Sequence, residues 1–499
     1  MWRSYAAVLV IAASAFALAG ATAVQTFSSI APVQTEDALV GYEWHDAPSM
    51  LTPRAQAAVV VLKDGNVLVI GGTAATGPTA TTELFDVKNA TWKPGPNLNV
   101  KRVAHTATLL KDGTVLVAGG ETGSGTTASS ELIDLSKGVS MPVSNMMLAR
   151  SGHAAVLLND GKVLAAGGSD WVTGRWANAE AFDPVAKKWL PAGGMKSARV
   201  FFAMHLLPDG TALAVSGDLN ATSEVYSPTT NSWLSEQKMS AKRYNFASTS
   251  IGAGKVLVAG GIVGDKLLNS TEVFDPGTGR WSSASDMNSP RAYFSMAMLM
   301  NGAVLASGSW SASGSASSAE VFYPSVNTWK LTDSMNRSRG AYGCAALPSG
   351  DVLVLGGRSG PSVISSVESY STMKLEPKKY CRPIDLVPLV LQATELPGNS
   401  SHGLIAKLEA AQAKYDANEM DVCLNVMNAF FNQFRSFARN GHMTQPHALA
   451  LYDGYASVVK CIGGTPEPFN VYASKSTVDE VKHAISKLVS PMFSVLFPV

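Results

Sequence analysis

The sequence predicts a mainly β protein: a seven-bladed β-propeller that is closed by an N-terminal strand and followed by a small C-terminal α-helical bundle. Three observations favour this fold. A pair of small residues ends an apolar run seven times at a spacing of 44 to 49 residues, the length of one four-stranded blade. An arginine precedes each pair by 16 or 17 residues. After residue 377 the apolar period changes from two to about 3.6 residues. The pairs are Gly71-Gly72, Gly119-Gly120, Gly167-Gly168, Ser216-Gly217, Gly260-Gly261, Ser307-Gly308 and Gly356-Gly357.

The N-terminus predicts export. After Arg3 an uncharged apolar run extends to about Gly20, and Ala21-Thr22-Ala23 offers a small-x-small cleavage site. Residues 1–23 are therefore a predicted secretory signal peptide, and residues 24–40 a linker. An uncleaved signal anchor is the alternative, because the apolar run is only slightly shorter than the roughly 20 residues that span a bilayer. We expect a secreted, extracellular or cell-envelope protein.

The charge balance excludes two classes of partner. The chain carries 39 Lys and Arg residues against 38 Asp and Glu residues, a net charge of +1. Such a balance provides no electrostatic footprint for nucleic acid or for an anionic membrane surface. Beyond the signal, the sequence predicts no transmembrane segment.

Each repeat unit contains four predicted strands. An Asp-Gly turn such as Asp64-Gly65 joins the first two strands, because glycine accepts the positive φ of a tight hairpin. In six of the seven units the fourth strand begins at a tryptophan. The first of these, Trp44, precedes the first complete unit, whereas the last unit stops near Tyr370 without one. The segment from Tyr42 to Met50 should therefore supply the fourth strand of the last blade, in a propeller that spans residues 41–377.

Paired glycines, a following glutamate with an aromatic residue, a tryptophan and an arginine that opens the next unit resemble the kelch repeat, from about Gly41 to Glu376. The resemblance implies a scaffold and no particular activity, because kelch propellers include binding domains and a few enzymes. The best-known of these enzymes resemble galactose oxidase, whose copper radical chemistry needs two histidines, two tyrosines and a cysteine bonded to one tyrosine.

The propeller offers few residues for such chemistry, and we predict no catalytic residue, no metal and no cofactor. No adjacent Tyr-His pair is present. The loop acids Glu121, Asp170 and Asp218 are available for acid–base chemistry on a sugar. A secreted carbohydrate-active or galactose oxidase-like enzyme is therefore the alternative to a binding protein. The histidines and the cysteine of the propeller are His45, His105, His153, His205 and Cys344.

Two rings of charge recur with the repeat. A glutamate follows each arginine by 29 residues in five units, by 30 in one and by 25 in another. One acid for each base at a fixed register predicts ion pairs that hold the blades together, because a buried charge without its partner is strongly destabilising. An anion-binding mouth is the alternative. The predicted pairs are Arg54 with Glu83, Arg102 with Glu131, Arg150 with Glu180, Arg199 with Glu224, Arg243 with Glu272, Arg291 with Glu320 and Arg339 with Glu368.

Departures from the repeat mark the candidate ligand site. The loops between the second and third strands emerge on one face, and the loop of residues 169–176 holds side chains that the repeat does not require. Exposed Trp and Arg residues are enriched at binding hot spots, so this face should recognise a glycan or an extracellular or envelope protein. Alternatively, the tryptophans cover the base of their own loop. The predicted contact residues are Asp170, Trp171, Arg175, Trp176 and Trp310.

The C-terminal residues predict a helical module. A proline-containing linker over residues 378–401 leads into three helices within residues 402–465, and residues 466–499 form a tail. The segments Leu404-Ile405-Ala406-Lys407-Leu408, Cys423-Leu424 and Asn428-Ala429-Phe430 resemble the FIMAH-type helical module of exported prokaryotic proteins. That resemblance implies an accessory or surface-related role and brings no catalytic motif.

Four cysteines allow three complete pairings in an exported chain. Cys423 opens the second predicted helix and Cys461 closes the third, so antiparallel packing predicts a disulfide bond between them. Cys344 and Cys381 are either free or tie the linker to the last blade.

Overall fold

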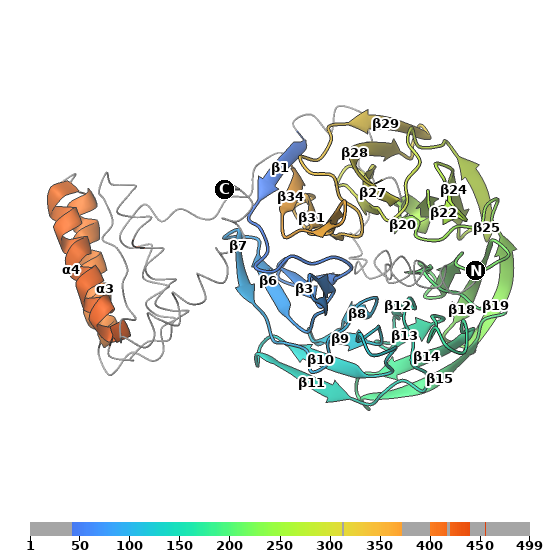
Figure 1. The fold of residues 1–499 in the computed structure, drawn as a ribbon, viewed down its shortest axis with the longest axis horizontal. Coiled ribbons are helices and arrows are strands. Elements are labelled where there is room, and N and C mark those ends of the chain that lie inside the picture. Colours follow the sequence, from blue (N-terminus) through green and yellow to red (C-terminus); the bar gives the residue numbers. More distant parts are fainter. Residues whose placement is uncertain (1–41, 312–313, 372–399, 417–419, 440–454, 456–499) are drawn as a thin grey trace, which may run out of the picture. The chain divides into compact units, whose positions relative to one another are not determined.

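The structure is a computed structural model of the 499-residue chain. It describes residues 42–311, 314–371, 400–416, 420–439 and 455. The chain divides between Pro377 and Lys378 into two compact units. In the first unit, seven four-stranded antiparallel sheets surround a central axis as the blades of a β-propeller (Figure 1).

Each blade runs from the axis to the rim, where Figure 1 shows the fourth strands β7, β11, β15, β19, β25 and β29. The strands of blades one to four are β2 (Ala58–Val61), β3 (Val67–Ile70), β6 (Thr82–Asp86) and β7 (Thr91–Pro94); β8 (Thr106–Leu109), β9 (Val115–Ala118), β10 (Ser130–Asp134) and β11 (Val139–Val143); β12 (Ala154–Leu157), β13 (Val163–Ala166), β14 (Asn178–Asp183) and β15 (Lys188–Gly194); β16 (Ala203–Leu206), β17 (Ala212–Val215), β18 (Thr222–Ser227) and β19 (Ser232–Lys238).

The strands of blades five to seven are β20 (Ala247–Ser250), β21 (Val256–Ala259), β24 (Thr271–Asp275) and β25 (Arg280–Ala284); β26 (Ser295–Met298), β27 (Val304–Ser311), β28 (Gly314–Tyr323) and β29 (Thr328–Thr332); β30 (Gly343–Ala346), β31 (Val352–Leu355), β34 (Val367–Ser371) and β1 (Glu43–Ala47). Small hairpins extend some loops between second and third strands. They are β4 (Thr73–Ala74) with β5 (Gly77–Pro78), β22 (Ile262–Val263) with β23 (Lys266–Leu267), and β32 (Arg358–Ser359) with β33 (Ser362–Val363).

The N-terminal strand closes the ring, as predicted. β1 pairs antiparallel with β34, with Trp44 opposite Tyr370 and Ala47 opposite Val367. β34 also pairs with β31, so the seventh blade combines the two ends of the propeller. The pairing covers the edge of β34 that would otherwise be open to the addition of a foreign strand.

The sixth small-residue pair lies one position later than the sequence pattern suggested. Gly308 has a φ of 66°, and its carbonyl accepts Nη1 of Arg291 at 3.0 Å. In the other blades the first residue of the pair accepts the same bond from an arginine 17 positions upstream. The pair is therefore Gly308-Ser309 and not Ser307-Gly308. A β-bulge between Ser307 and Ser309 had obscured this register.

The repeated tryptophans pack between blades, and the partner of the indole N–H varies. In two blades the acceptor is a serine of the preceding blade, which stands directly before the repeated glutamate of that blade. In the fourth blade the corresponding neighbour is Ala179, and Nε1 of Trp233 has no hydrogen-bond partner among the described residues. The bonded pairs are Trp189 with Ser130 at 3.1 Å and Trp281 with Ser223 at 2.8 Å.

The second unit contains the described helices α3 (Ser400–Asp416) and α4 (Met420–Arg439). Tyr455 stacks on Phe431 of α4 with ring centroids 4.4 Å apart. The rest of the third predicted helix, the signal peptide, Cys461 and the side chain of Cys423 lie outside the described residues, so the disulfide bond and the FIMAH resemblance stay predictions. No described helix is long and apolar enough to span a membrane. Among the described side chains of the two helices, the buried apolar ones are Leu404, Leu408, Ala411, Met427, Phe430, Phe431 and Phe434.

Candidate functional site

The seven arginines and seven glutamates form buried ion pairs inside the blades. Every arginine side chain is at most 1% exposed, and its Nη2 lies 2.5 to 2.9 Å from Oε1 of the glutamate at the expected register. Because a buried carboxylate matches each positive charge, these arginines offer no free charge to an anion.

Each ion pair also forms hydrogen bonds with three backbone segments, as in the first blade. Nη1 of Arg54 donates to the carbonyls of Gly71 and Thr81, at the two ends of the loop between second and third strands. Glu83 accepts the backbone N–H groups of Leu51-Thr52, in the connection from the previous blade. Burial lowers the pKa of Arg54, and the charge of Glu83 opposes that shift. We call this arrangement the clamp; it positions the loops of one face.

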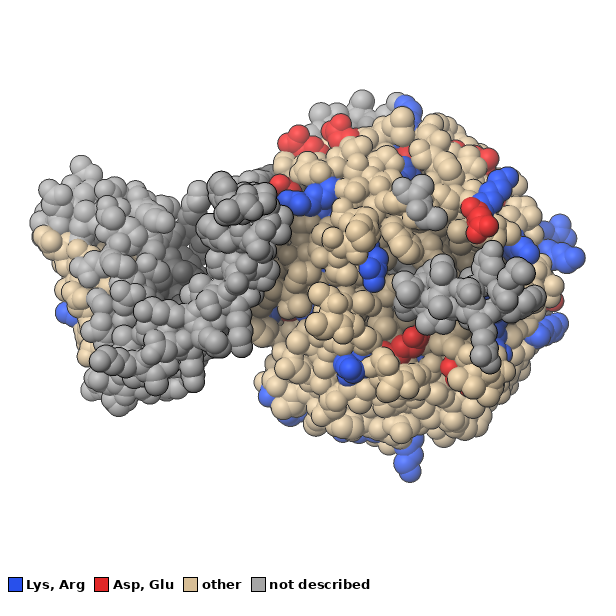
Figure 2. Space-filling view, viewed as in Figure 1, with Lys and Arg blue, Asp and Glu red and all other residues tan. Residues whose placement is uncertain are grey.

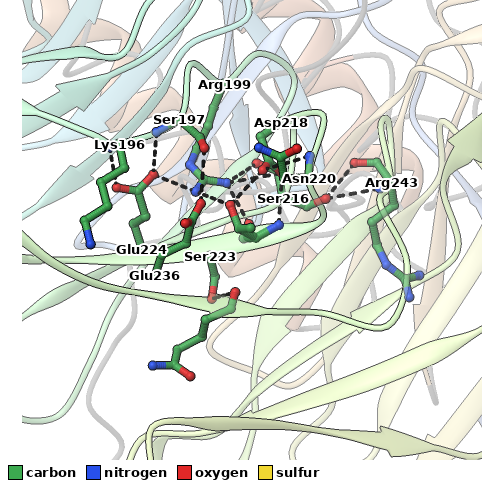
Figure 3. Close-up of polar contacts among 12 residues, drawn as sticks. Lys196, Ser197, Arg199, Ser216, Asp218, Asn220, Ser223, Glu224, Glu236 and Arg243 are labelled. Carbon is green, nitrogen blue, oxygen red and sulfur yellow. Dashed lines mark hydrogen bonds and ion pairs between the residues drawn. The ribbon is translucent and has the colours of Figure 1, made fainter.

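The fourth blade adds a second acid to its clamp (Figure 3). Arg199 pairs with Glu224 at 2.7 Å and lies 3.5 Å from Asp218. Asp218 accepts the backbone N–H and the hydroxyl of Thr222 and the backbone N–H of Asn220. Its exposed fraction is 1%. Asp218 therefore stabilises its short loop and is occupied by these contacts.

Asp170 shapes the loop that carries the predicted contact residues. Its carboxylate accepts the backbone N–H groups of Val172, Thr173 and Gly174 and the hydroxyl of Thr173, at 2.6 to 3.3 Å. Burial alone would raise the pKa of Asp170, but these hydrogen bonds bring it down to about 2. The carboxylate is therefore ionised and engaged within its own loop.

Trp171 is exposed and at the same time held in place. Its ring stacks on Phe201 with centroids 5.5 Å apart and planes at 25°. Its Nε1 donates to Oε1 of Glu121 at 2.6 Å, and Glu121 also accepts the hydroxyl of Ser151. The residue is 38% exposed. This arrangement favours ligand contact, because a preorganised side chain loses little conformational freedom on binding.

Arg175 and Trp176 differ in what they contact. Nη1 of Arg175 donates to the hydroxyl of Tyr244 at 3.1 Å, and the guanidinium lies 5.3 Å from the centroid of that ring. Nε1 of Trp176 donates to the carbonyl of Ala149 at 3.2 Å, and the side chain is half-buried. Trp176 thus covers the base of its loop, the alternative considered above, whereas Trp171 is open to solvent.

Trp310 lies on an elongated hairpin of the sixth blade, which β27 and β28 form. Its ring meets Tyr293 edge to face, with centroids 5.1 Å apart and planes at 82°. Tyr293 and Phe201 occupy the same register, two positions after the clamp arginine of their blades. Trp171 and Trp310 are therefore anchored on equivalent residues of two blades.

One residue of each blade, two positions after the clamp arginine, belongs to what we call the inner ring. Its members are Gln56, Ala104, Gly152, Phe201, Asn245, Tyr293 and Ala341. All seven have a positive φ, between 51° and 63°. Inter-blade backbone hydrogen bonds of 2.9 to 3.2 Å run from Gly152 to Ala104, Phe201 to Gly152, Tyr293 to Asn245, Ala341 to Tyr293 and Gln56 to Ala341. Because backbone bonds fix this ring, its side chains can vary without changing the fold.

Three consecutive members of the inner ring form an arc across blades four to six: Phe201, Asn245 and Tyr293. Their exposed fractions are 8%, 8% and 7%. Oδ1 of Asn245 has no hydrogen-bond partner among the described residues. No recurring residue type marks this arc in the sequence, so it was not among the predicted contact residues. The signal that could have found it is a fixed register at which the side chain changes from blade to blade.

Three histidines of the propeller, His105, His153 and His205, are buried and have lowered pKa values. Burial lowers the pKa of His105 to about 3 and that of His205 to about 4. Nε2 of His153 lies 3.0 Å from the hydroxyl of Thr106. Burial raises the pKa of the Cys344 thiol to about 12. Within residues 42–371 and the two helices, as far as they are described, no three His, Cys, Asp or Glu side chains could hold a metal ion.

Seven closed four-stranded blades, each with the same arginine clamp, define a structural class, the seven-bladed β-propeller. The kelch motif family model matches residues 53–99 and 242–288, which cover the first and fifth units. The chain is thus a kelch-repeat propeller.

Among solved structures, the chain is similar to a fungal alcohol oxidase of the AA5 family, described as catalytically diverse and determined in complex with copper. The TM-score is 0.56 at 17% sequence identity, over 68% of this chain and 78% of that chain. At this identity the similarity shows the fold alone. A comparison with curated proteins found no match.

Proposed function

We propose that this chain is an exported binding protein whose propeller recognises a glycan or a protein through the face that carries the loops between second and third strands. One observation carries the proposal: Trp171 and Trp310, which the repeat does not require, are each held against a residue of the inner ring. Aromatic side chains fixed in this way are typical of binding hot spots.

The hydrogen bonds of the loop carboxylates favour a binding function over acid–base catalysis. Asp170 and Asp218 are both engaged within their own loops, and Glu121 accepts hydrogen bonds from Trp171 and Ser151. A general acid or base needs a proton that it can exchange with substrate. Figure 2 shows charged residues of both signs distributed among more numerous uncharged ones on the described part of the face in view. Such a surface supports recognition by shape and aromatic contact.

The test uses the chain from residue 24 onward on a glycan array and in a pulldown from cell-envelope extract. We expect the double variant Trp171→Ala with Trp310→Ala to lose the captured ligand. Trp176→Ala is the matched control: it removes an indole from the same loop, so it should lower the melting temperature and leave the ligand contact largely intact. Retained binding by the double variant would refute the assignment of this face.

Export is tested separately, by determining where the chain is located in the native host and which residue forms its mature N-terminus.

The similarity to a copper-containing alcohol oxidase keeps an enzyme as the second candidate. Purified chain loaded with copper would then retain the metal in elemental analysis and release hydrogen peroxide from alcohols or sugars. We expect neither result, because His105, His153 and His205 are buried in the blades and the Cys344 thiol is buried as well. Stoichiometric copper with turnover would replace the binding proposal.

A further inference from the structure

The buried amide of Asn245 has no evident role in the fold. The residue is 8% exposed, and Oδ1 lacks a partner among the described residues. A buried carbonyl oxygen without a hydrogen bond is destabilising, and native proteins seldom retain one without a reason. Ala104 and Ala341 occupy the same register in two other blades with φ of 52° and 58°, close to the 52° of Asn245. The ring therefore does not need an asparagine at this position.

The residues around Asn245 indicate the chemistry of a ligand that could hydrogen-bond to its side-chain amide. Phe201 and Tyr293, on either side in the inner ring, are aromatic, and each bears one of the loop tryptophans. Two charged residues that contact Tyr244, the sequence neighbour of Asn245, are already engaged: Arg175 donates to the hydroxyl of Tyr244, and the carboxylate of Asp218 accepts groups of its own loop. A ligand at the arc would meet aromatic carbon and one amide acceptor.

We propose that the arc of Phe201, Asn245 and Tyr293 binds one pyranose residue of an uncharged glycan, with Oδ1 of Asn245 accepting a sugar hydroxyl. This inference rests on the proposed function and narrows it to one ligand class. A pyranose combines an apolar C–H face, which packs against aromatic rings, with hydroxyl donors at its edge. The accessible aromatic surface beside the arc is Trp171, which is 38% exposed and stacked on Phe201.

The experiment compares two asparagine variants by calorimetry on the uncharged oligosaccharide that gives the strongest array signal with the unmodified chain. Asn245→Ala should weaken binding at least tenfold and leave the melting temperature unchanged or higher, because alanine already occupies this register in two blades. Asn231→Ala is the matched control. Asn231 also has a positive φ, of 50°, but its Oδ1 accepts the hydroxyl of Tyr226 at 2.8 Å. That variant should lower the melting temperature and leave glycan affinity unchanged.

The outcomes separate the two proposals. If the unmodified chain binds an uncharged glycan and Asn245→Ala binds it equally well, the arc assignment is wrong while the binding function stands. If the chain captures only charged glycans or only a protein through the same face, the ligand class is wrong and the binding function again stands. If Trp171→Ala with Trp310→Ala leaves every captured ligand bound, the proposed function itself is overturned. A fall in melting temperature with Asn245→Ala equal to that of the control would assign the amide a structural role.

Discussion

The ring of Phe201 lies against the backbone of Gly152: a Cβ atom added to Gly152 would come within 2.8 Å of Cε1 of Phe201. Phe201 in turn supports Trp171. The exposed tryptophan of the third blade thus depends on a glycine of the inner ring, through one intervening aromatic residue.

Gly152→Ala should therefore displace Phe201 and loosen the stack with Trp171. We expect weaker ligand binding and a smaller change in tryptophan fluorescence on ligand addition. Gly138→Ala is the control, because Gly138 has a similar φ of 68° against 63° and no atom near the added Cβ. Both variants bear the cost of a positive φ, about 1 kcal/mol. Equal effects of the two on binding would contradict the dependence.

The clamp predicts a large stability loss on removal of one charge. Arg243→Ala would leave Glu272 buried without its ion pair and would free the carbonyls of Gly260 and Ser270. Breaking one partner of a buried pair typically costs about 3–5 kcal/mol. Urea denaturation measures the change, and Arg175→Ala, on an exposed loop, should cost far less. A variant as stable as the unmodified chain would mean that the clamp contributes nothing.

A single hydroxyl should stabilise the interface between blades three and four. Ala179→Ser places an acceptor at the register where Ser130 and Ser223 accept an indole N–H, so Trp233 would gain the partner that it lacks. A hydrogen bond of this kind contributes about 1 kcal/mol. Thermal unfolding should show a higher midpoint for Ala179→Ser and a lower one for Ser223→Ala. A lower midpoint for both would show that the site has no room for the hydroxyl.

Stability should fall in mild acid because of the buried histidines. The pKa of His105 is about 3 in the folded chain against an ordinary value of 6.5, so the fold favours the neutral ring. The stability contribution is complete above about pH 6.5 and is lost progressively as the pH falls toward 3, by up to about 1.4 kcal/mol per pH unit. His105→Phe should flatten this dependence, since Phe202, Phe246 and Phe294 occupy the same register. Urea midpoints at pH 7 and 4.5 measure it; an unchanged slope would exclude His105 as a source.

Sequence reasoning predicted the scaffold because its determinants recur. The clamp arginines and glutamates recur in all seven blades and the tryptophans in six, each at a register dictated by blade geometry, so the copies reinforce one interpretation. The register of Ser307-Gly308 was wrong by one position, since a bulge there adds a residue that spacing alone cannot locate.

The candidate site was only partly predictable, because it depends on contacts between residues that lie far apart in the sequence. Trp171 and Trp310 stood out as departures from the repeat, but their supports, Phe201 and Tyr293, lie 30 and 17 positions away in the sequence. The separate roles of Trp171 and Trp176 likewise depend on which ring meets a neighbour. The pairing of side chains across blades follows from the circular arrangement, which no local pattern encodes.

Nε1 of Trp44 donates to the carbonyl of Asp333, a residue 289 positions later in the chain. The first strand of the propeller therefore has no sheet to join until nearly the whole domain has been synthesised. Six blades can assemble from neighbouring hairpins before β1 has a strand to pair with. The docking of β1 is therefore a late event, and closing so long a loop costs conformational entropy. A chain interrupted before β34 would retain a solitary β1 and an incomplete last blade, the state most exposed to proteases and most dependent on chaperones.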